Sequence, residues 1–351
     1  MKALLSAFAR LIRLMSPDDL QEALRILVHR MERVGSDFVT YHLRPKRPGE
    51  GRVYAISGKS KDHKPMAIVI QGPVVHQDSF TLETVRFYRK RYPEAKLILS
   101  TWKDQAPLDA FQALGVMVCL GDKPSNNGPF NINMQIVSAT NGIRAAKESG
   151  CGLVVKTRTD QRMHVEDLEG FMYGLQETFP VKDGPLKARL IASSFTTLKY
   201  RPFSISDMFM CGDVDDMLLY WDLPLDDRTQ HDIAFKTVKD FTDNRIGEVY
   251  LCTEFLKKLG DLESLSLRAY WDVLRQYFCI VDYHSLDAYW PKYDRFREHR
   301  YTYYEGLHSY ELLTFRDWLS VYRGYYPPEI SDETMAGTPE GKYFKIQSEK
   351  V

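Results

Sequence analysis

The sequence lacks the glycine-rich signatures of two large classes of nucleotide-binding enzymes. It contains no GxGxxG segment, which is typical of dinucleotide-binding dehydrogenases, and no GxxxxGK[ST] segment, which is typical of P-loop NTPases. It also lacks net charge, because 47 Lys and Arg residues balance 47 Asp and Glu residues. Without a basic excess the protein has no long-range field that would attract nucleic acid, so we expect no nucleic-acid partner.

Cysteine is scarce, and long hydrophobic runs are missing. The five cysteines are widely spaced and include no CxxC pair, which argues against a zinc site and a disulfide framework. No apolar run is long enough to cross a bilayer, and Arg10 and Arg13 interrupt the N-terminal apolar segment. We therefore expect neither a signal peptide nor a membrane span, and we predict a cytoplasmic protein with reduced thiols.

The first residues nevertheless form an amphipathic pattern. One interpretation is peripheral association with the inner face of the cytoplasmic membrane, and the other is packing on the protein's own domain or on a second subunit of a homo-oligomer. A second amphipathic helix is predicted from Leu20 to Met31, after a Ser16-Pro17 start signal. The apolar face of the first pattern consists of Leu4, Leu5, Phe8, Leu11, Ile12 and Met15.

From residue 66 onward, short apolar runs alternate with amphipathic helical patterns. This alternation predicts an α/β fold with a mostly parallel sheet and right-handed crossovers. We expect a helical extension and linker in residues 1–65, an α/β core in residues 66–225 and a helical C-terminal lobe in residues 226–351. The predicted strands are 67–70, 96–99, 116–120, 153–156, 189–193 and about 207–211, and the predicted helices are 81–92, 133–149, 215–221 and 248–259.

The most informative stretch follows the fourth predicted strand. Its apolar run ends in Lys156, Arg158 and Asp160, which alternate along the chain. Ligands of open α/β sheets bind at the carboxyl ends of the strands. Two cations beside one carboxylate suit a phosphorylated ligand together with a hard divalent metal. The alternative is an ordinary salt-bridged strand end that binds nothing.

Six motifs in a fixed order resemble the WavE family of bacterial lipopolysaccharide-synthesis proteins. The motifs cover about residues 66–295 and read VIQGPV, LILSTW, NMQIVSATNGI, VVKTRTD, RPFSISDMF and AYWPKY. The resemblance implies a GT-A-type, Rossmann-like glycosyltransferase that moves a sugar from a nucleotide-sugar donor to a glycan or glycolipid acceptor, in lipopolysaccharide, capsule or another surface polysaccharide. On this interpretation residues 66–225 bind the nucleotide sugar, and residues 226–351 lie on the acceptor side.

The resemblance also implies a metal motif, which this sequence matches only in part. GT-A enzymes carry an acidic DXD motif after the fourth strand, and here the text is Arg158-Thr159-Asp160, without the first acid. Asp160 is therefore the candidate ligand of a divalent metal, Mn²⁺ or Mg²⁺. Arg158 is the candidate for neutralising the diphosphate directly. Both alternatives are left open.

The remaining site candidates follow from what the transfer needs. An inverting reaction requires a carboxylate that accepts the acceptor's proton, and Asp207 and Glu254 are the candidates; the sequence leaves inverting and retaining courses open. The expected nucleotide-binding residues are Gln71, Gly72, Pro73, Ser100, Trp102, Asn133, Gln135, Lys156 and Arg158.

Two other functions fit parts of the sequence. The missing first acid favours a non-catalytic, nucleotide-sugar-binding subunit of a polysaccharide assembly complex. A sugar nucleotidyltransferase has a similar sheet, but it normally carries a Gly-rich basic loop after the first strand. The segment from Gln71 to His76 is not such a loop, so we disfavour this class.

Overall fold

The computed structural model describes residues 11–12, 14–35, 38–39, 43–54, 63–105, 107–291, 312–331 and 334. The chain divides into two compact units, Met1–Pro45 and Lys46–Val351. In the first unit, helix α2 (Pro17–Val34) begins with Pro at its first turn and with a capping box between Ser16 and Asp19, as predicted.

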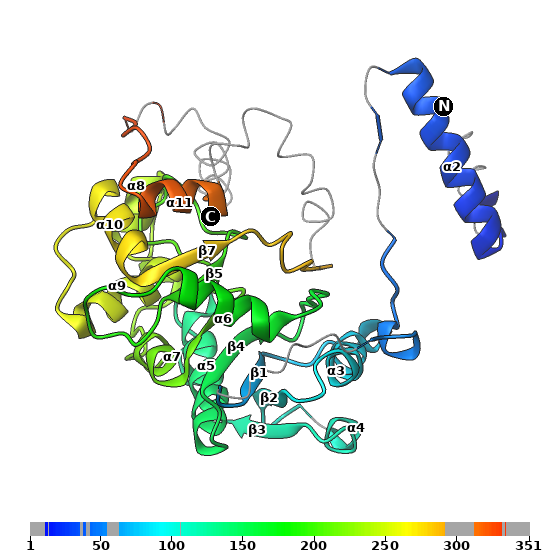
Figure 1. Ribbon diagram of the computed structural model, residues 1–351, viewed down its shortest axis with the longest axis horizontal. Coiled ribbons are helices and arrows are strands. Elements are labelled where there is room, and N and C mark those ends of the chain that lie inside the picture. Colours follow the sequence, from blue (N-terminus) through cyan, green and yellow to red (C-terminus); the bar gives the residue numbers. More distant parts are fainter. Residues whose placement is uncertain are drawn as a thin grey trace. The chain divides into compact units, whose positions relative to one another are not determined.

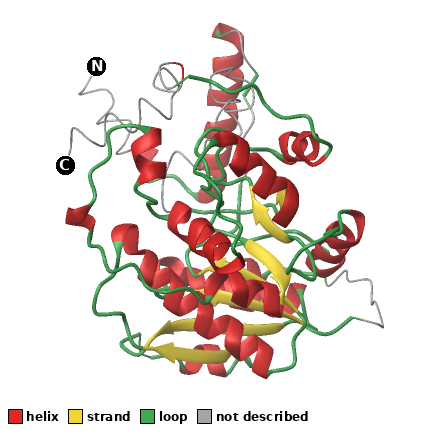
Figure 2. Ribbon diagram, turned by 90° about the vertical axis from the view of Figure 1, so that its left-hand side faces the viewer, coloured by secondary structure: helices red, strands yellow, loops and turns green. Residues whose placement is uncertain are grey.

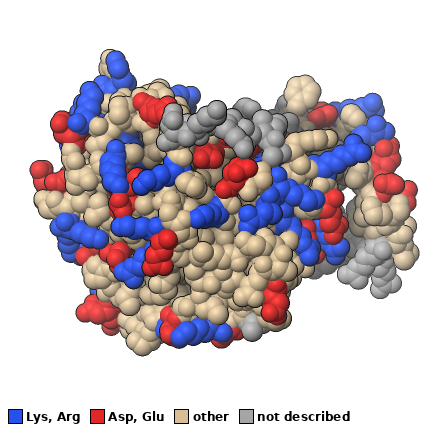
Figure 3. All heavy atoms as spheres, turned by 60° about the horizontal axis from the view of Figure 1, so that its bottom comes forward, with Lys and Arg blue, Asp and Glu red and all other residues tan. Residues whose placement is uncertain are grey.

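The N-terminal amphipathic pattern lies mostly outside the described residues, so its membrane-binding and packing interpretations both stay predictions. Among the helices that are described, none has the length and hydrophobicity needed to cross a bilayer. On the face seen in Figure 3, Lys and Arg side chains are interspersed with Asp and Glu side chains.

In the described part of the second unit, seven strands form one sheet in the order β3-β2-β1-β4-β6-β5-β7 (Figure 1). Strands β1 to β4 pair in parallel, as do β5 and β7, whereas β6 runs antiparallel to both of its neighbours. The prediction of a mostly parallel α/β sheet is thus confirmed. The strands are β1 (Met66–Gln71), β2 (Lys96–Trp102), β3 (Met117–Gly121), β4 (Leu153–Arg158), β5 (Leu190–Ser193), β6 (Met210–Asp213) and β7 (Phe278–Val281).

Helices cover both faces of this sheet (Figures 1 and 2). The α-helices are α3 (Phe80–Arg91), α4 (Asp109–Gln112), α5 (Ile132–Glu148), α6 (Leu168–Thr178), α7 (Val214–Trp221), α8 (Val238–Asp243), α9 (Glu248–Leu259), α10 (Leu267–Tyr277) and α11 (Phe315–Tyr322). Short 3₁₀ turns are η1 (Pro48–Glu50), η2 (Gln77–Ser79), η3 (Pro129–Asn131) and η4 (Gln230–Asp232).

Helix α5 packs very closely on the sheet. It contacts β1, a strand in which every residue is buried. A Cβ atom at Gly142 would lie 2.3 Å from Cγ1 of Val69, so glycine is what permits this approach. The predicted apolar face of the helix is buried as expected and consists of Ile136, Ala139, Ile143 and Ala146.

The structure differs from the expected elements at several places, and strand β2, for example, continues to Trp102 instead of ending at residue 99. Strand β4 continues through Arg158, two residues further than predicted, while β6 starts only at Met210 and leaves Asp207 in the preceding loop. Strand β7 was not predicted, because FCIV is short and follows α10 directly. The C-terminal lobe is therefore not purely helical. The domain boundaries near residues 65 and 225 stay predictions.

Candidate functional site

A cavity of about 920 Å³ lies where strands β1 and β4 end. Strand β1 is followed in the sheet by β2 on one side and by β4 on the other, so the order of the strands reverses at this point. Open α/β sheets bind their ligands in the crevice at such a switch point. Gln71 and Arg158 are register partners at the ends of the two strands, and both line the cavity.

The floor of the cavity is a hydrogen-bonded turn after β1. The Ser138 hydroxyl donates to Oε1 of Gln71, and the Ser100 hydroxyl donates to the Ser138 carbonyl at 2.6 Å. The Gly72 amide donates to the Ser100 carbonyl at 3.0 Å. Gly72 has a φ of 117°, which an L side chain rarely adopts. These contacts hold Gln71 and Gly72 in place at the cavity, and Pro73 follows them in its lining.

Two polar atoms near this floor have no protein partner. Trp102 and Gln135 both line the cavity. Within the described part of the chain, Nε1 of Trp102 and Oε1 of Gln135 are buried without a hydrogen bond. Buried polar groups in native proteins are nearly always paired, so each such exception needs an explanation. A donor and an acceptor that line a cavity suit a polar ligand such as a base or a ribose.

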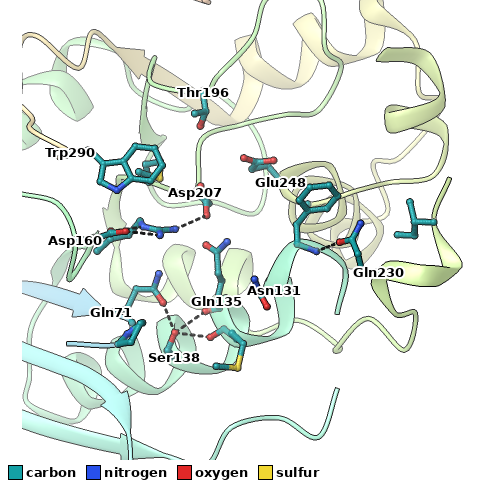
Figure 4. Close-up of a pocket in the computed structure, with 18 of the residues that line it drawn as sticks. Gln71, Asn131, Gln135, Ser138, Asp160, Thr196, Asp207, Gln230, Glu248 and Trp290 are labelled. Carbon is teal, nitrogen blue, oxygen red and sulfur yellow. Dashed lines mark hydrogen bonds and ion pairs between the residues drawn. The ribbon is translucent and has the colours of Figure 1, made fainter. Parts of the chain in front are cut away.

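The charged centre of the cavity is Arg158, which lies between two carboxylates. These belong to Asp160 and Asp207, both labelled in Figure 4. Nε and Nη2 of Arg158 donate to the two carboxylate oxygens of Asp160 at 2.9 and 3.1 Å. Its Nη1 lies 3.7 Å from Oδ2 of Asp207. The Trp290 ring lies on another side of the guanidinium, with its centroid 5.6 Å from Cζ. These four side chains come from β4 and from three later segments of chain.

Lys156 supports this centre from inside the protein. Its side chain is fully buried, and its Nζ donates to the backbone carbonyl of Asp207. The Trp221 ring lies 4.4 Å from the same Nζ. Burial lowers the pKa of Lys156 to about 7, although the Asp207 charge opposes that shift. Lys156 therefore does not line the cavity as a nucleotide ligand, but holds the loop that carries Asp207.

The structure also leaves three other predicted residues out of the cavity. Ser100 supports the floor, as described above. Asn133 exchanges hydrogen bonds with the backbone of Asp226, both at 2.7 Å, and so ties α5 to the chain after α7. The Glu254 carboxylate pairs with Arg245 and, at 2.9 Å, with Lys257. Their side chains satisfy other parts of the protein instead of facing a ligand.

Glu248 lines the cavity, and the sequence did not point to it (Figure 4). A glutamate in the first turn of a helix is an ordinary start residue, so its position carried no signal. The turns around the cavity are unusual as well. Positive φ angles occur at five lining residues, and such conformations concentrate at functional sites. These residues are Gly72, Phe130, Asn131, Thr196 and Gly247.

The acidic side chains of the cavity suit a divalent metal that is held by a single protein carboxylate. The described residues contain no group of three or more Asp, Glu, His or Cys side chains placed to hold a metal. Mg²⁺ and related ions often use one protein carboxylate together with phosphate oxygens and water. Asp160 fits that role, but both of its oxygens already accept hydrogen bonds from Arg158. A metal would therefore share this carboxylate with the guanidinium.

The fold and the cavity define an α/β protein with a polar cavity at the switch point of its sheet. Residues 66–336 match the WavE lipopolysaccharide synthesis family, and this match covers well over half of the chain. The protein therefore belongs to the WavE family. The predicted resemblance is confirmed by this match. No curated protein matches the chain.

Three solved structures show a remote likeness to this chain. One is a mannose-1-phosphate geranyltransferase from Thermus thermophilus (14% identity, TM-score 0.24), over 37% of this chain and only 41% of that one. Another is glucosyl-3-phosphoglycerate synthase from Mycobacterium tuberculosis with Mn²⁺, UDP and glucosyl-3-phosphoglycerate (13%, TM-score 0.36), over 83% and 88% of the two chains. A third is core-mannan synthase A from Aspergillus fumigatus in an Mn and GDP form (8%, TM-score 0.31), over 72% and 81%.

Proposed function

We propose that the protein transfers a glycosyl group from a nucleotide-sugar donor to an acceptor used in lipopolysaccharide or other surface-polysaccharide synthesis. The observation that carries the proposal is the position of Arg158, between Asp160 and Asp207 at the switch point of the sheet. The cavity of about 920 Å³ is within the usual size range of small-molecule sites, which reaches about 1,000 Å³. Membership of the WavE family supports lipopolysaccharide synthesis as the process that uses the product.

The donor binds along the strand ends. Gln71, Trp102 and Gln135 hold the base and the ribose. Among the described residues, Nε1 of Trp102 and Oε1 of Gln135 lack protein partners and are the polar atoms available for this contact. Arg158 binds the diphosphate, because a planar guanidinium presents paired donors to phosphate oxygens. Its charge stabilises the negative charge that develops on the leaving diphosphate. A divalent metal, when bound at Asp160, would supply further neutralisation of the same charge.

Asp207 acts on the acceptor. As the acceptor oxygen bonds to the anomeric carbon, the bond from that carbon to the diphosphate breaks, and the acceptor's proton passes to the Asp207 carboxylate. This is the inverting course, in which the base and the leaving group lie on opposite sides of the sugar. Asp207 lines the cavity and lies in the loop before β6, anchored by Lys156.

A donor screen tests the proposal. Purified protein is mixed with nucleotides and nucleotide sugars, with Mn²⁺ or with EDTA, and its melting temperature and the release of nucleoside diphosphate are measured. A ligand at a hundredfold excess over its Kd should stabilise the folded state by about 2.7 kcal/mol. If no donor is bound or consumed, the proposal fails. Binding without consumption, with acceptor glycan present, favours the non-catalytic subunit, which the pairing of Asp160 with Arg158 would also suit.

A further inference from the structure

The cavity extends beyond Arg158 to a wall of three phenylalanines, Phe130, Phe235 and Phe241. Their ring centroids are 6.0 Å apart for Phe130–Phe235, 6.1 Å for Phe130–Phe241 and 5.3 Å for Phe235–Phe241. In Figure 4, Gln230 marks this end of the cavity, on the opposite side of the view from Asp160 and Trp290. The donor site described above does not use this aromatic wall.

The aromatic wall is held in place by hydrogen bonds between two distant segments. Nδ2 of Asn126 donates to the carbonyls of Asp227 and Arg228 at 2.9 and 3.1 Å. The Phe130 amide donates to Oε1 of Gln230 at 2.9 Å. Phe130 has a φ of 53° and remains 48% exposed, although a bulky side chain seldom adopts that conformation. A large apolar ring kept exposed inside a cavity by strained backbone indicates a contact surface.

Two cations border the aromatic wall. Cζ of Arg201 lies 4.9 Å from the centroid of Phe241, and Arg201 lines the cavity. Lys236 follows Phe235 directly, is exposed and also lines the cavity. Of the three carboxylates in the cavity lining, Asp160 and Asp207 both lie against Arg158, which leaves Glu248 as the remaining one. The wall therefore combines an apolar surface with two basic side chains.

We propose that the aromatic wall is the acceptor subsite, and that it takes a glycan carrying an anionic substituent, a phosphate or a carboxylate, close to the hydroxyl that is extended. The apolar face of a sugar ring packs on Phe130 and Phe235. The substituent pairs with Arg201 and Lys236, as charged hydrogen bonds to guanidinium and ammonium groups favour. The assignment as acceptor rests on the proposed function, whereas binding of the glycan does not require turnover.

Calorimetric titration tests this subsite without relying on catalysis. The probes are a lipid-free core oligosaccharide, the same oligosaccharide after removal of its phosphates, and the same oligosaccharide after reduction of its carboxyl groups. We expect the intact probe to bind about tenfold more tightly than the form that lacks the recognised anion, which corresponds to about 1.4 kcal/mol. Which treated form loses affinity identifies the anion. Binding should also weaken as salt is raised.

Variants complete the test. Lys236→Gln and Arg201→Gln should each bind the intact probe about tenfold more weakly and lose the discrimination between probes, while Arg201→Lys should retain part of it. Lys239→Gln is the matched control, because Lys239 pairs with Asp243 and does not line the cavity. Equal affinity for all three probes, no binding of any probe, or unchanged affinity in Lys236→Gln would overturn the proposal. Glycan binding without any consumption of nucleotide sugar would instead contradict the proposed function and leave the subsite standing.

Discussion

The buried Nζ of Lys156 on β4 donates a hydrogen bond to the backbone carbonyl of Asp207, in the loop before β6. A fully buried lysine is costly unless its polar head finds partners, and here the partners are a carbonyl and the Trp221 ring. The carbonyl belongs to the residue that we propose as the base. Lys156 is thus a positioning residue for the reaction, acting through Asp207.

Lys156→Met should separate positioning from binding. Methionine fills much of the same volume but cannot donate to the Asp207 carbonyl, so the loop loses its anchor. We expect kcat to fall at least tenfold, about 1.4 kcal/mol of barrier, with little change in the KM for the donor. Lys147→Met, at an exposed ion pair with Asp215, is the control. A variant that is less stable but keeps its kcat would make Lys156 purely structural.

The same lysine predicts a pH dependence of stability. Burial lowers its pKa from 10.5 to about 7 in the folded protein. Between these values the unfolded chain binds a proton that the folded chain does not, so the stability contributed by this group is lost as the pH falls from 10.5 toward 7. One proton gives a slope of at most about 1.4 kcal/mol per pH unit. Urea unfolding measures the free energy of unfolding at pH 7 and at pH 9. This free energy should rise more between the two pH values for wild type than for Lys156→Met. An equal rise in both proteins would exclude this titration.

Asp207→Asn tests the proposed base. Asparagine keeps the size and most hydrogen bonding of the side chain but cannot take the acceptor's proton. The rate should fall by about 10² to 10⁴-fold. Donor affinity should change far less than the rate, because the Asp207 carboxylate reaches the donor's diphosphate only through its ion pair with Arg158. Glu254→Gln, outside the cavity, should keep most of the activity. Retention of more than about a tenth of the wild-type turnover in Asp207→Asn, above that range, would remove Asp207 from the role.

Gln135→Met tests the unpartnered acceptor in the donor half of the cavity. Among the residues that the structure describes, Oε1 of Gln135 is buried and finds no hydrogen-bond partner. Replacing it by an apolar group of similar shape should therefore leave the stability unchanged or raise it. The nucleotide loses one hydrogen bond, so its Kd should rise about three- to tenfold. Melting temperature and calorimetric titration measure the two effects. An unchanged Kd would place the nucleotide elsewhere.

Gly142 and Gly174 make a matched pair in two helices. Glycine to alanine in a helix interior normally stabilises by roughly 1 kcal/mol. At Gly174 a Cβ meets nothing within 4 Å, so Gly174→Ala should follow this rule. At Gly142 it would lie 2.3 Å from Val69 and 3.1 Å from Cβ of Ser100, so overpacking should dominate and destabilise by about 1–3 kcal/mol. Chemical denaturation measures the change in the free energy of unfolding for both variants. If Gly142→Ala stabilises the protein, α5 can move away from the sheet.

The elements that the sequence predicted well are those whose pattern is local. The prediction for α9, Glu248 to Leu259, matches the structure residue for residue, because helical periodicity and capping lie within one short window. Strand β7 lacks such a signal. Four apolar residues after a helix are compatible with several structures, and only pairing with β5, almost 90 residues earlier, makes them a strand.

The residues of the site were likewise predictable only where the signal is local in the sequence. Gln71 and Trp102 could be predicted because they follow strands, and strand ends at one edge converge whatever the details of packing. The role of Asn133 could not be predicted from the residues next to it in the sequence, because its hydrogen-bond partner Asp226 is 93 residues away. Phe130 and Lys236 likewise reach the cavity only because the segment after β3 and the segment before α8, about 100 residues apart, come together.

The order of the strands in the sheet has a consequence for synthesis on the ribosome. The four strands β1 to β4 are neighbours and are complete once residue 158 has emerged, so this half of the sheet can form early. Strand β5 borders β6 on one side and β7 on the other, and β7 ends only at residue 281. While residues 214–277 are being translated, one edge of β5 therefore has no strand to pair with. We expect the nascent chain to be most prone to aggregation in this interval, and a chaperone that shields β5 would act there.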